Sequence, residues 1–365
     1  AGSAPVLAAP GYLIYVRGAS LVAQRFDTRG LRMRGEPIAL GEAPPPSGHD
    51  GASRVTVAEN GTIVHVGAGL PDTELRWYDR RGDPIGTIPL PPGRYASMSI
   101  SADGKRLCVE RRNSGSASDL WLLDLDRPVP ARFTFGPSQN GSPLWSPDGS
   151  RIAFNSDRAG PWNIYVRPAS GGTEETPLLV SSTLFKNLSQ WSPDGRTVLF
   201  FAPDPETGWD QWLLPVEGDR KPVAYLHTRY TEGGGVISPD GRWMAYGCDE
   251  SGRMEVYVQS FPKPGGKYQI STSGSGYGTS FIMWAPGGQE LIFLAGDEST
   301  LMAADVRTSP VFHAGTPRRL FKLRPDRTGF AVTPDGRRVL VAAPAGEASR
   351  TTVTLVQNWT AALKR

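Results

Sequence analysis

The sequence has few of the residues that build metal sites and disulfide frameworks. It contains two cysteines, Cys108 and Cys248, and four histidines. No two histidines have the spacing of a metal-binding motif such as His-x-His or His-x-x-x-His. No run of 18 apolar residues occurs, so we expect no segment of this chain to span a membrane. The composition therefore predicts a chain without a cofactor.

Long runs of one charge are also missing. The 39 basic and 36 acidic residues give a formal net charge of +3. The densest basic groups are pairs, such as Arg80-Arg81, Arg111-Arg112 and Arg337-Arg338. A nucleic-acid-binding arm needs a longer basic run, so we expect no nucleic-acid partner. Helical periodicity is absent outside the extreme C-terminus, at Trp359–Leu363.

Glycine and proline, in contrast, are abundant. The chain holds 43 glycines and 33 prolines in 365 residues, an excess that calls for many turns. A hydrophobic content of 39% and ten tryptophans indicate a packed core rather than disorder. These features predict an all-β chain of short strands joined by tight turns.

A turn motif repeats along the chain with an even period. Its clearest copies are Trp-Ser-Pro-Asp-Gly at 145–149 and at 191–195. The last glycines of seven copies lie at 61, 104, 149, 195, 241, 288 and 336, with spacings of 43, 45, 46, 46, 47 and 48. Proline fixes one corner, aspartate can bond to nearby backbone N–H groups, and glycine accepts a positive φ. We interpret the motif as structural and not as a site.

Four short runs per repeat predict one four-stranded blade of a β-propeller. An additional blade precedes the seven copies, with strands expected at Pro5–Ala9, Gly11–Val16, Leu21–Phe26 and Pro37–Leu40. The last copy, from Phe330, supplies three strands that end at Thr352–Gln357. We predict one domain over residues 1–365, a closed propeller of about eight blades. Seven blades, with the two chain ends sharing one sheet, is the alternative.

The repeat also assigns roles to single residue types. Cys108 and Cys248 lie three repeats apart, so we expect them to be separate and buried. Tryptophans at one repeat position, such as Trp145, Trp191 and Trp284, are interpreted as packing between blades. Trp209 and Trp212 break the period and are the better candidates for exposed contact residues.

The repeat resembles that of TolB-like bacterial propellers, on the segment LWSPDGSRIAF at 144–154. Three further segments resemble the C-terminal propeller that follows the kinase domain in many bacterial serine/threonine protein kinases. They are Gly11-Tyr12-Leu13, DESGRMEVYVQ at 249–259 and VTLVQNW at 353–359. The resemblance covers nearly the whole chain.

The resemblance implies a non-catalytic sensor or docking domain on the extracytoplasmic side of a membrane-anchored parent. The chain has no kinase motifs and begins at Ala1 without Met, so we expect it to be part of a longer protein. The expected partner is a peptide, a sugar or a protein. An envelope scaffold that binds proteins is a lesser alternative.

Two enzymatic functions are known for related propellers, a peptidase and a polysaccharide lyase. A prolyl-oligopeptidase-type peptidase needs Gly-x-Ser-x-Gly and a hydrolase domain, and the nearest sequence, at 274–278, has the wrong spacing. We therefore expect no peptidase activity. A metal-dependent polysaccharide lyase is the main alternative function, in which His49 and His227 could approach each other across the ring.

If the chain binds a ligand, the mouth of the central channel is the expected place, because several loops converge there above a rigid ring. The candidates are the residues in loops that enter the innermost strands: His49, Asp50, Tyr95, Asn140, Lys186, Asn187, His227, Glu232, Tyr277 and Arg327.

Overall fold

The structure is a computed structural model. It describes residues 5–8, 11–17, 20–42, 55–58, 62–67, 72–91, 93–113, 117–172, 175–181, 185–276, 281–325, 327–345 and 352–360. These residues form 32 strands and one short 3-10 helix, η1 (Pro286–Gly288). Within them, no helix is long and apolar enough to cross a membrane. The all-β prediction is confirmed.

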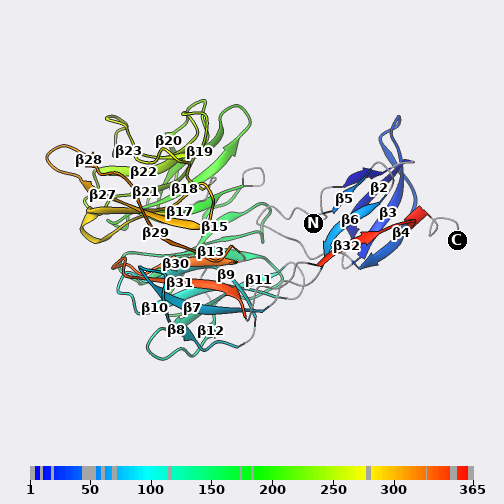
Figure 1. The fold of residues 1–365 in the computed structure, drawn as a ribbon, viewed down its shortest axis with the longest axis horizontal. Coiled ribbons are helices and arrows are strands. Elements are labelled where there is room, and N and C mark those ends of the chain that lie inside the picture. The colour runs from blue at the N-terminus through cyan, green and yellow to red at the C-terminus, as the bar shows by residue number, and fades with distance from the viewer. Residues whose placement is uncertain are drawn as a thin grey trace. The chain divides into compact units, whose positions relative to one another are not determined.

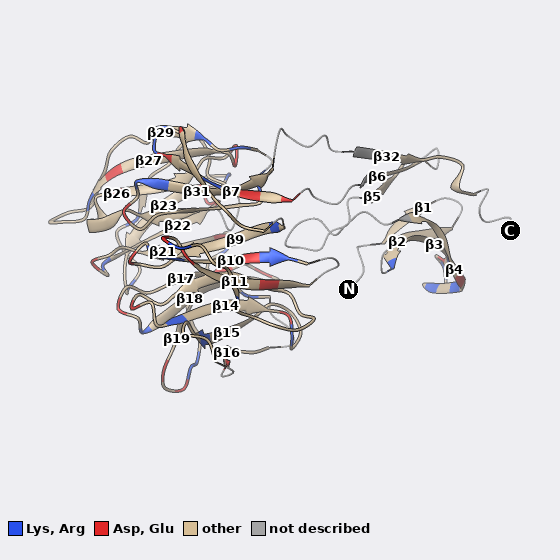
Figure 2. Cartoon of the chain, turned by 90° about the horizontal axis from the view of Figure 1, so that it is seen from below, with Lys and Arg blue, Asp and Glu red and all other residues tan. Residues whose placement is uncertain are grey.

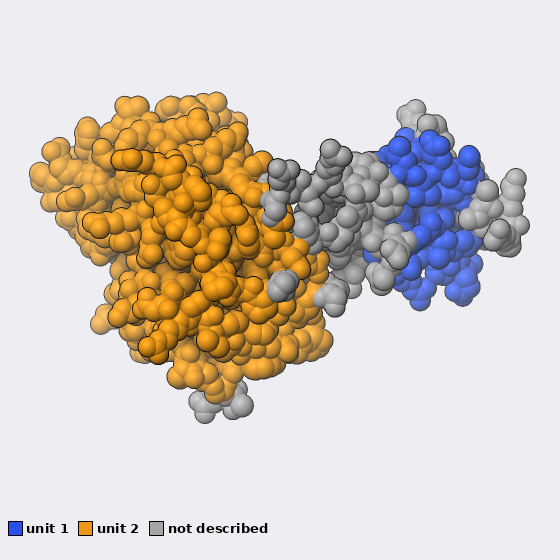
Figure 3. Space-filling model, turned by 60° about the horizontal axis from the view of Figure 1, so that its bottom comes forward, with its two compact units in different colours: residues 1–71, 114–116, 346–365 blue, residues 72–113, 117–345 orange. Residues whose placement is uncertain are grey.

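The chain divides into two compact units (Figure 3). Unit 1 comprises residues 1–71, 114–116 and 346–365, and unit 2 comprises residues 72–113 and 117–345. A division by contacts does not by itself separate folding domains, so the single domain over residues 1–365 stays a prediction.

Unit 2 contains six antiparallel sheets (Figure 1). Five follow the chain order: β9 (Arg94–Ile100), β10 (Arg106–Arg112), β11 (Ser118–Asp124) and β12 (Ala131–Arg132); β13 (Asn140–Trp145), β14 (Arg151–Ser156), β15 (Asn163–Pro168) and β16 (Thr176–Leu179); β17 (Asn187–Trp191), β18 (Thr197–Asp204), β19 (Gly208–Pro215) and β20 (Val223–Leu226); β21 (Glu232–Ile237), β22 (Trp243–Cys248), β23 (Glu255–Ser260) and β24 (Tyr268–Gln269); β25 (Ile282–Trp284), β26 (Glu290–Leu294), β27 (Thr300–Arg307), β28 (His313–Ala314) and β29 (Arg318–Lys322). The sixth has the order β30 (Gly329–Val332), β31 (Arg338–Pro344), β7 (Thr73–Asp79) and β8 (Pro84–Ile88). Five of the six sheets have the four antiparallel strands that were predicted and that are typical of a propeller blade, and the sheet β25–β29 has five.

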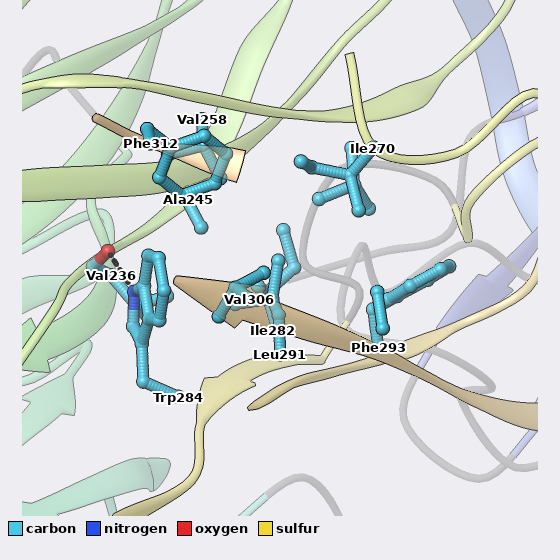
Figure 4. Close-up of a cluster of buried hydrophobic side chains, with 12 residues drawn as sticks. Val236, Ala245, Val258, Ile270, Ile282, Trp284, Leu291, Phe293, Val306 and Phe312 are labelled. Atoms are coloured by element: carbon cyan, nitrogen blue, oxygen red, sulfur yellow. Dashed lines mark hydrogen bonds between the residues drawn. The ribbon is translucent and has the colours of Figure 1, made fainter. Parts of the chain in front are cut away.

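Each sheet of unit 2 packs against the next through its innermost strand. Strands β9, β13, β17, β21 and β25 contact one another in that order, and β30 contacts β9. The rings of Phe281, just before β25, and Phe330 in β30 lie 4.8 Å apart. The apolar core lies between the sheets, as in the cluster of β21–β23 with β25–β27 (Figure 4).

Two of the periodic tryptophans join neighbouring sheets. The Trp284 indole donates to the Val236 carbonyl at 3.0 Å (Figure 4), and the Trp145 indole donates to the Ser99 carbonyl at the same distance. Trp191 is buried against the preceding sheet, but its indole donates to the carbonyl of Gly195 in its own turn. Packing between sheets is confirmed. Cys108 and Cys248 are free and buried, as predicted.

The Pro-Asp-Gly turns are held by a hydroxyl–carboxylate pair. The Ser146 hydroxyl donates to Asp148 at 2.5 Å and accepts from the Arg151 N–H at 2.9 Å. The hydrogen bond from the Ser146 hydroxyl, with those from the Ser150 N–H and hydroxyl, lowers the pKa of Asp148 to about 2. Gly149 has a φ of +67°, which favours glycine. The motif is structural, as predicted.

Unit 1 contains two sheets. The first, β1 (Val6–Ala8), β2 (Tyr12–Arg17), β3 (Ser20–Asp27) and β4 (Arg32–Glu42), confirms the expected sheet before the seven copies. The second has the order β32 (Thr352–Val356), β6 (Ile63–Gly67) and β5 (Val55–Val57). Both contribute to a core that includes Ile14, Ile63 and Trp359.

The first and last copies of the turn motif exchange strands, which the sequence analysis did not predict. The copy at Gly61 was expected to form one sheet from β5 to β8. Instead, β6 pairs with β32, whereas β7 pairs with β31 over seven consecutive residues. The β7–β31 pairing fully buries Leu75, Leu340 and Ala342, so it contributes much apolar area. The number of blades in one ring stays a prediction.

Candidate functional site

The Pro-Asp-Gly turns lie at one edge of each sheet, and the loops that enter the innermost strands lie at the opposite edge, because the strands alternate in direction. Seven of the ten predicted channel-mouth residues are described. They are Tyr95, Asn140, Lys186, Asn187, His227, Glu232 and Arg327. His49, Asp50 and Tyr277 lie outside the described residues.

Three of the seven are engaged in bonds within the fold. The buried Tyr95 hydroxyl donates to the Pro91 carbonyl at 2.7 Å. The fully buried Asn140 amide donates to the Ser118 carbonyl at 2.9 Å. The Arg327 guanidinium donates to the carbonyls of Arg324 and Glu298. These contacts support structural roles for all three.

Lys186 is a buried ammonium group. Its side chain is 1% exposed, and Nζ donates to Asn163 Oδ1 at 2.8 Å. Burial lowers the pKa of Lys186 to about 8. The next residue, Asn187, is half-buried at the start of β17.

His227 pairs with an aspartate that the sequence analysis missed. Asp210, in β19, is fully buried, and its Oδ2 lies 2.7 Å from His227 Nδ1. The Thr207 hydroxyl donates to the same oxygen at 2.9 Å. The hydrogen bond and the charge of Asp210 raise the pKa of His227, whose side chain is 49% exposed. The other carboxylate oxygen, Asp210 Oδ1, has no hydrogen-bond partner among the described residues.

Glu232 begins β21 and lies beside this pair. It is 2% exposed, and its Oε1 accepts a hydrogen bond from the Thr228 hydroxyl. Its Oε2 also has no partner within the described part of the chain. Burial raises the pKa of Glu232 to about 7, and the charge of Asp210 acts in the same direction. We name Asp210, His227 and Glu232 the carboxylate–histidine cluster.

The cluster contains two buried oxygens that can accept further hydrogen bonds. A buried acceptor without a donor costs about 1–3 kcal/mol, and more if it is charged. Native proteins contain few such groups, and each needs an explanation. A ligand that donates hydrogen bonds would satisfy both oxygens. The His227 ring, exposed at the same place, marks an accessible side of the cluster.

Two tryptophans of β19 lie close to Asp210 in the sequence. Trp209 precedes Asp210, and its ring lies 5.4 Å from that of Phe201 and 6.3 Å from that of Phe185. Trp212 stacks on Phe200 at 6.3 Å. Both tryptophans are half-buried. In the sequence, the feature that pointed to the neighbourhood of Asp210 was therefore the pair Trp209 and Trp212, which break the repeat period of the other tryptophans.

The two larger hollows described in unit 2 differ in character. A cavity of about 270 Å³ is lined by every innermost strand, with apolar residues such as Met98, Leu144, Leu188, Val236, Ile282 and Phe330. A larger groove of about 910 Å³ lies between the Pro-Asp-Gly turns at 146–151 and 193–197, at the strand ends away from the loops that enter the innermost strands. Its turn carboxylates, Asp148 and Asp194, already accept hydrogen bonds from Ser146 and Ser192. The cluster is therefore the better candidate site.

No group of three His, Cys, Asp or Glu side chains is placed to hold a metal ion within the residues that the structure describes. Lys and Arg are interspersed with Asp and Glu over the strands and loops of unit 2 (Figure 2). The candidate site is therefore a local group of acidic residues, and not part of a larger surface that carries charge of one sign.

Comparison with known sequences finds propeller relatives. Residues 88–210 match the family model described as TolB beta propeller domain. An uncharacterised protein of Agrobacterium fabrum is 27% identical over 213 residues, which is 56% of this chain and 67% of that protein. An uncharacterised peptidase of Bacillus subtilis is 29% identical over 107 residues. That match spans 29% of this chain and 16% of the peptidase.

Solved structures show the same fold. A candidate TolB from Agrobacterium tumefaciens has a TM-score of 0.59 at 20% identity, over 76% of this chain and 100% of that one. TolB from Acinetobacter baumannii has a TM-score of 0.52 at 13% identity, over 93% of this chain and 80% of that one. The chain is therefore similar in fold to TolB-like β-propellers.

Proposed function

We propose that this chain is a non-catalytic binding propeller that takes its ligand at the carboxylate–histidine cluster. The observation that carries the proposal is the pair of buried oxygens, Asp210 Oδ1 and Glu232 Oε2, without partners among the described residues. They lie at the loop edge of the sheets, where propeller ligands commonly bind. The TolB-like fold supports a binding role more than a catalytic one.

The proposal includes closure of the six sheets of unit 2 into one ring. The contact of β30 with β9 supports it, as does the cavity that all six innermost strands line. The Thr328 hydroxyl also donates to the Tyr95 carbonyl, next to this junction. A closed ring removes free sheet edges and holds the loops rigidly around one site.

A thermal-shift screen of the intact chain tests the binding role. Short peptides, sugars, oligouronides and divalent metals are screened at pH 8, and a ligand at 100 times its Kd should stabilise the fold by about 2.7 kcal/mol. Asp210→Asn should abolish the shift, whereas Glu217→Gln, in the opposite groove, should keep it. A shift that survives Asp210→Asn, or no shift at all, contradicts the proposal. Turnover of an oligouronide would favour the lyase instead.

We further propose that the parent protein is a bacterial serine/threonine kinase and that this chain is its extracytoplasmic sensor or docking domain. The support is the resemblance of Gly11-Tyr12-Leu13 and Asn358-Trp359 to that group. In unit 1, the rings of Tyr12 and Trp359 meet edge to face at 5.8 Å, so the two segments share one core. The coding sequence upstream of Ala1 tests this idea. A kinase domain followed by a membrane-spanning segment is expected, and any other upstream sequence contradicts it.

A further inference from the structure

We propose that the ligand of the carboxylate–histidine cluster is an organic cation that bears a primary ammonium or a guanidinium group, an inference that rests on the binding role proposed above. The group can belong to a free amine or to a lysine or arginine side chain of a peptide. Nothing in the family comparison assigns a ligand to Asp210 or Glu232, and the inference comes from the chemistry of the two side chains.

The donor requirement follows from the unpaired atoms. When Glu232 is ionised, neither carboxylate can donate a hydrogen bond, so Asp210 Oδ1 and Glu232 Oε2 both require N–H or O–H donors. Ammonium presents three donors and guanidinium five, enough to satisfy two oxygens from one ligand. Hydrogen bonds between charged partners are about twice as strong as neutral ones.

The charge requirement follows from burial. Asp210 is fully buried and Glu232 is 2% exposed, and two buried carboxylates repel each other unless a positive charge lies between them. His227 neutralises the Oδ2 side of Asp210 when it is protonated. Within the described part of the chain, no lysine or arginine forms an ion pair with Glu232. The charge of Lys267 lowers the pKa of Glu232, but Lys267 itself pairs with Glu250 and lies 4.7 Å over the Tyr257 ring. A ligand cation would supply the missing charge.

A metal ion fits the cluster less well than an organic cation. No three potential metal ligands converge within the described residues, and a hard divalent ion would need several oxygens at short distance. An organic cation needs hydrogen-bond geometry to the two oxygens and no closed coordination shell.

Binding should strengthen as the pH rises. The titratable groups that interact with Glu232 or His227 are Asp204, Asp210, Tyr246, Cys248 and Lys267. The burial of Glu232 raises its pKa to about 7, and Asp210 raises the pKa of His227. Glu232 is therefore mostly neutral at pH 6 and mostly ionised at pH 8.5. The added negative charge of Glu232 attracts a cation at the higher pH, and loss of the His227 proton as the pH rises acts in the same direction.

Isothermal titration calorimetry of the intact chain tests this inference. The probes are agmatine, which carries both cationic groups, the blocked tripeptide Gly-Arg-Gly, the neutral diol 1,4-butanediol, and Mg²⁺. We expect agmatine or the tripeptide to bind at least tenfold more tightly at pH 8.5 than at pH 6. Glu232→Gln should weaken this binding at least tenfold, as should Asp210→Asn, whereas Glu217→Gln should leave it unchanged. The diol and Mg²⁺ should not bind.

The outcomes separate the ligand class from the site. Binding of the tripeptide without agmatine supports the cation and identifies a peptide as its source; binding of agmatine identifies a free amine. If the diol or Mg²⁺ binds and Glu232→Gln abolishes that binding, the organic cation is the wrong ligand class but the cluster remains the binding site. No binding of any probe, together with a thermal-shift screen that finds no ligand sensitive to Asp210→Asn, overturns both proposals. Thermal unfolding of each variant shows whether it is folded.

Discussion

The aspartates and glutamates of this protein occupy two opposite environments. The turn carboxylates, such as Asp148, accept local hydrogen bonds and have lowered pKa values. Glu232 is buried with one unpartnered oxygen, and its pKa is raised. The first environment is local and could be predicted from the Pro-Asp-Gly motif. The second depends first on burial and then on the charge of Asp210, which lies 22 residues from Glu232, and sequence reasoning had no signal for either.

Glu232 and His227 should make the fold less stable as the pH rises. Glu232 ionises near 4.5 in the unfolded chain and near 7 in the folded one, so the folded state holds more protons between these values. Stability therefore falls from pH 4.5 to 7. The raised pKa of His227 acts in the same sense, because its stabilisation is complete below pH 6.5 and is lost as the pH rises through its folded pKa.

We expect the melting temperature to fall by several degrees from pH 5 to pH 8. For Glu232 the loss is about 2 kcal/mol. Glu232→Gln should remove most of the fall, and the control Glu217→Gln should retain it. Differential scanning calorimetry at a series of pH values measures both. A fall of equal size in Glu232→Gln would show that Glu232 does not ionise as described.

Gly149→Val tests the turn at a single residue. The φ of +67° resists a β-branched side chain, and an added Cβ would lie 2.5 Å from Arg106 Nη2. That guanidinium donates to the Gly149 carbonyl and lies 4.5 Å over the Trp145 ring. We expect a loss of more than about 1 kcal/mol in thermal unfolding. Gly149→Asn should cost less, since asparagine tolerates positive φ. An unchanged melting temperature in Gly149→Val would contradict the turn geometry.

At the scale of elements, the tryptophan bridges explain how one sheet positions the next. Trp284→Phe removes the indole N–H that reaches the Val236 carbonyl in the preceding sheet. Trp191→Phe makes the same change in volume, but its N–H bonds within its own turn. We expect Trp284→Phe to cost about 2 kcal/mol, roughly 1 kcal/mol more than Trp191→Phe. Urea unfolding compares them. Equal losses would show that the bridge adds nothing to the packing between sheets.

The first and last copies of the turn motif exchange strands, and this pairing could not be predicted from local sequence. The strands themselves were predicted within a few residues, as at β2 (Tyr12–Arg17) and β3 (Ser20–Asp27). Their partners were not, because the β6–β32 and β7–β31 pairings join segments that lie far apart in the sequence. Pairing over such sequence separations depends on the complete core, which no local pattern records.

At the scale of the whole molecule, Gly329 tests whether the six sheets of unit 2 form a ring. It begins β30, and an added Cβ would lie within 2.7 Å of the Ala96 carbonyl carbon in β9. Both strands would have to separate, because the obstacle is backbone. We expect Gly329→Ala to cost about 2 kcal/mol or more.

Gly195→Ala is the matched control for this junction. Gly195 has a φ of +74° and open space around an added Cβ, so the change should cost about 1 kcal/mol. Chemical denaturation gives both values. A Gly329→Ala variant as stable as Gly195→Ala would mean that β30 and β9 are not in close contact in solution, and that the ring is open at this point.

The repeat made the fold class predictable, and the site only in part. The even spacing of the glycines predicted the antiparallel sheets and the edge at which loops gather. Of the residues predicted at that edge, His227 and Glu232 belong to the cluster, whereas Tyr95 and Asn140 complete hydrogen bonds of the fold. Side-chain burial and unpaired atoms are products of packing, so a turn motif cannot distinguish these roles.

Hydrogen–deuterium exchange of the intact chain, with and without agmatine at pH 8.5, tests most directly whether the loop edge of unit 2 is the binding face. We predict protection in the peptides that cover residues 204–211 and 226–235, which contain Asp210, His227 and Glu232. Protection instead at the turns 146–151 and 193–197, which line the larger groove, would contradict the account.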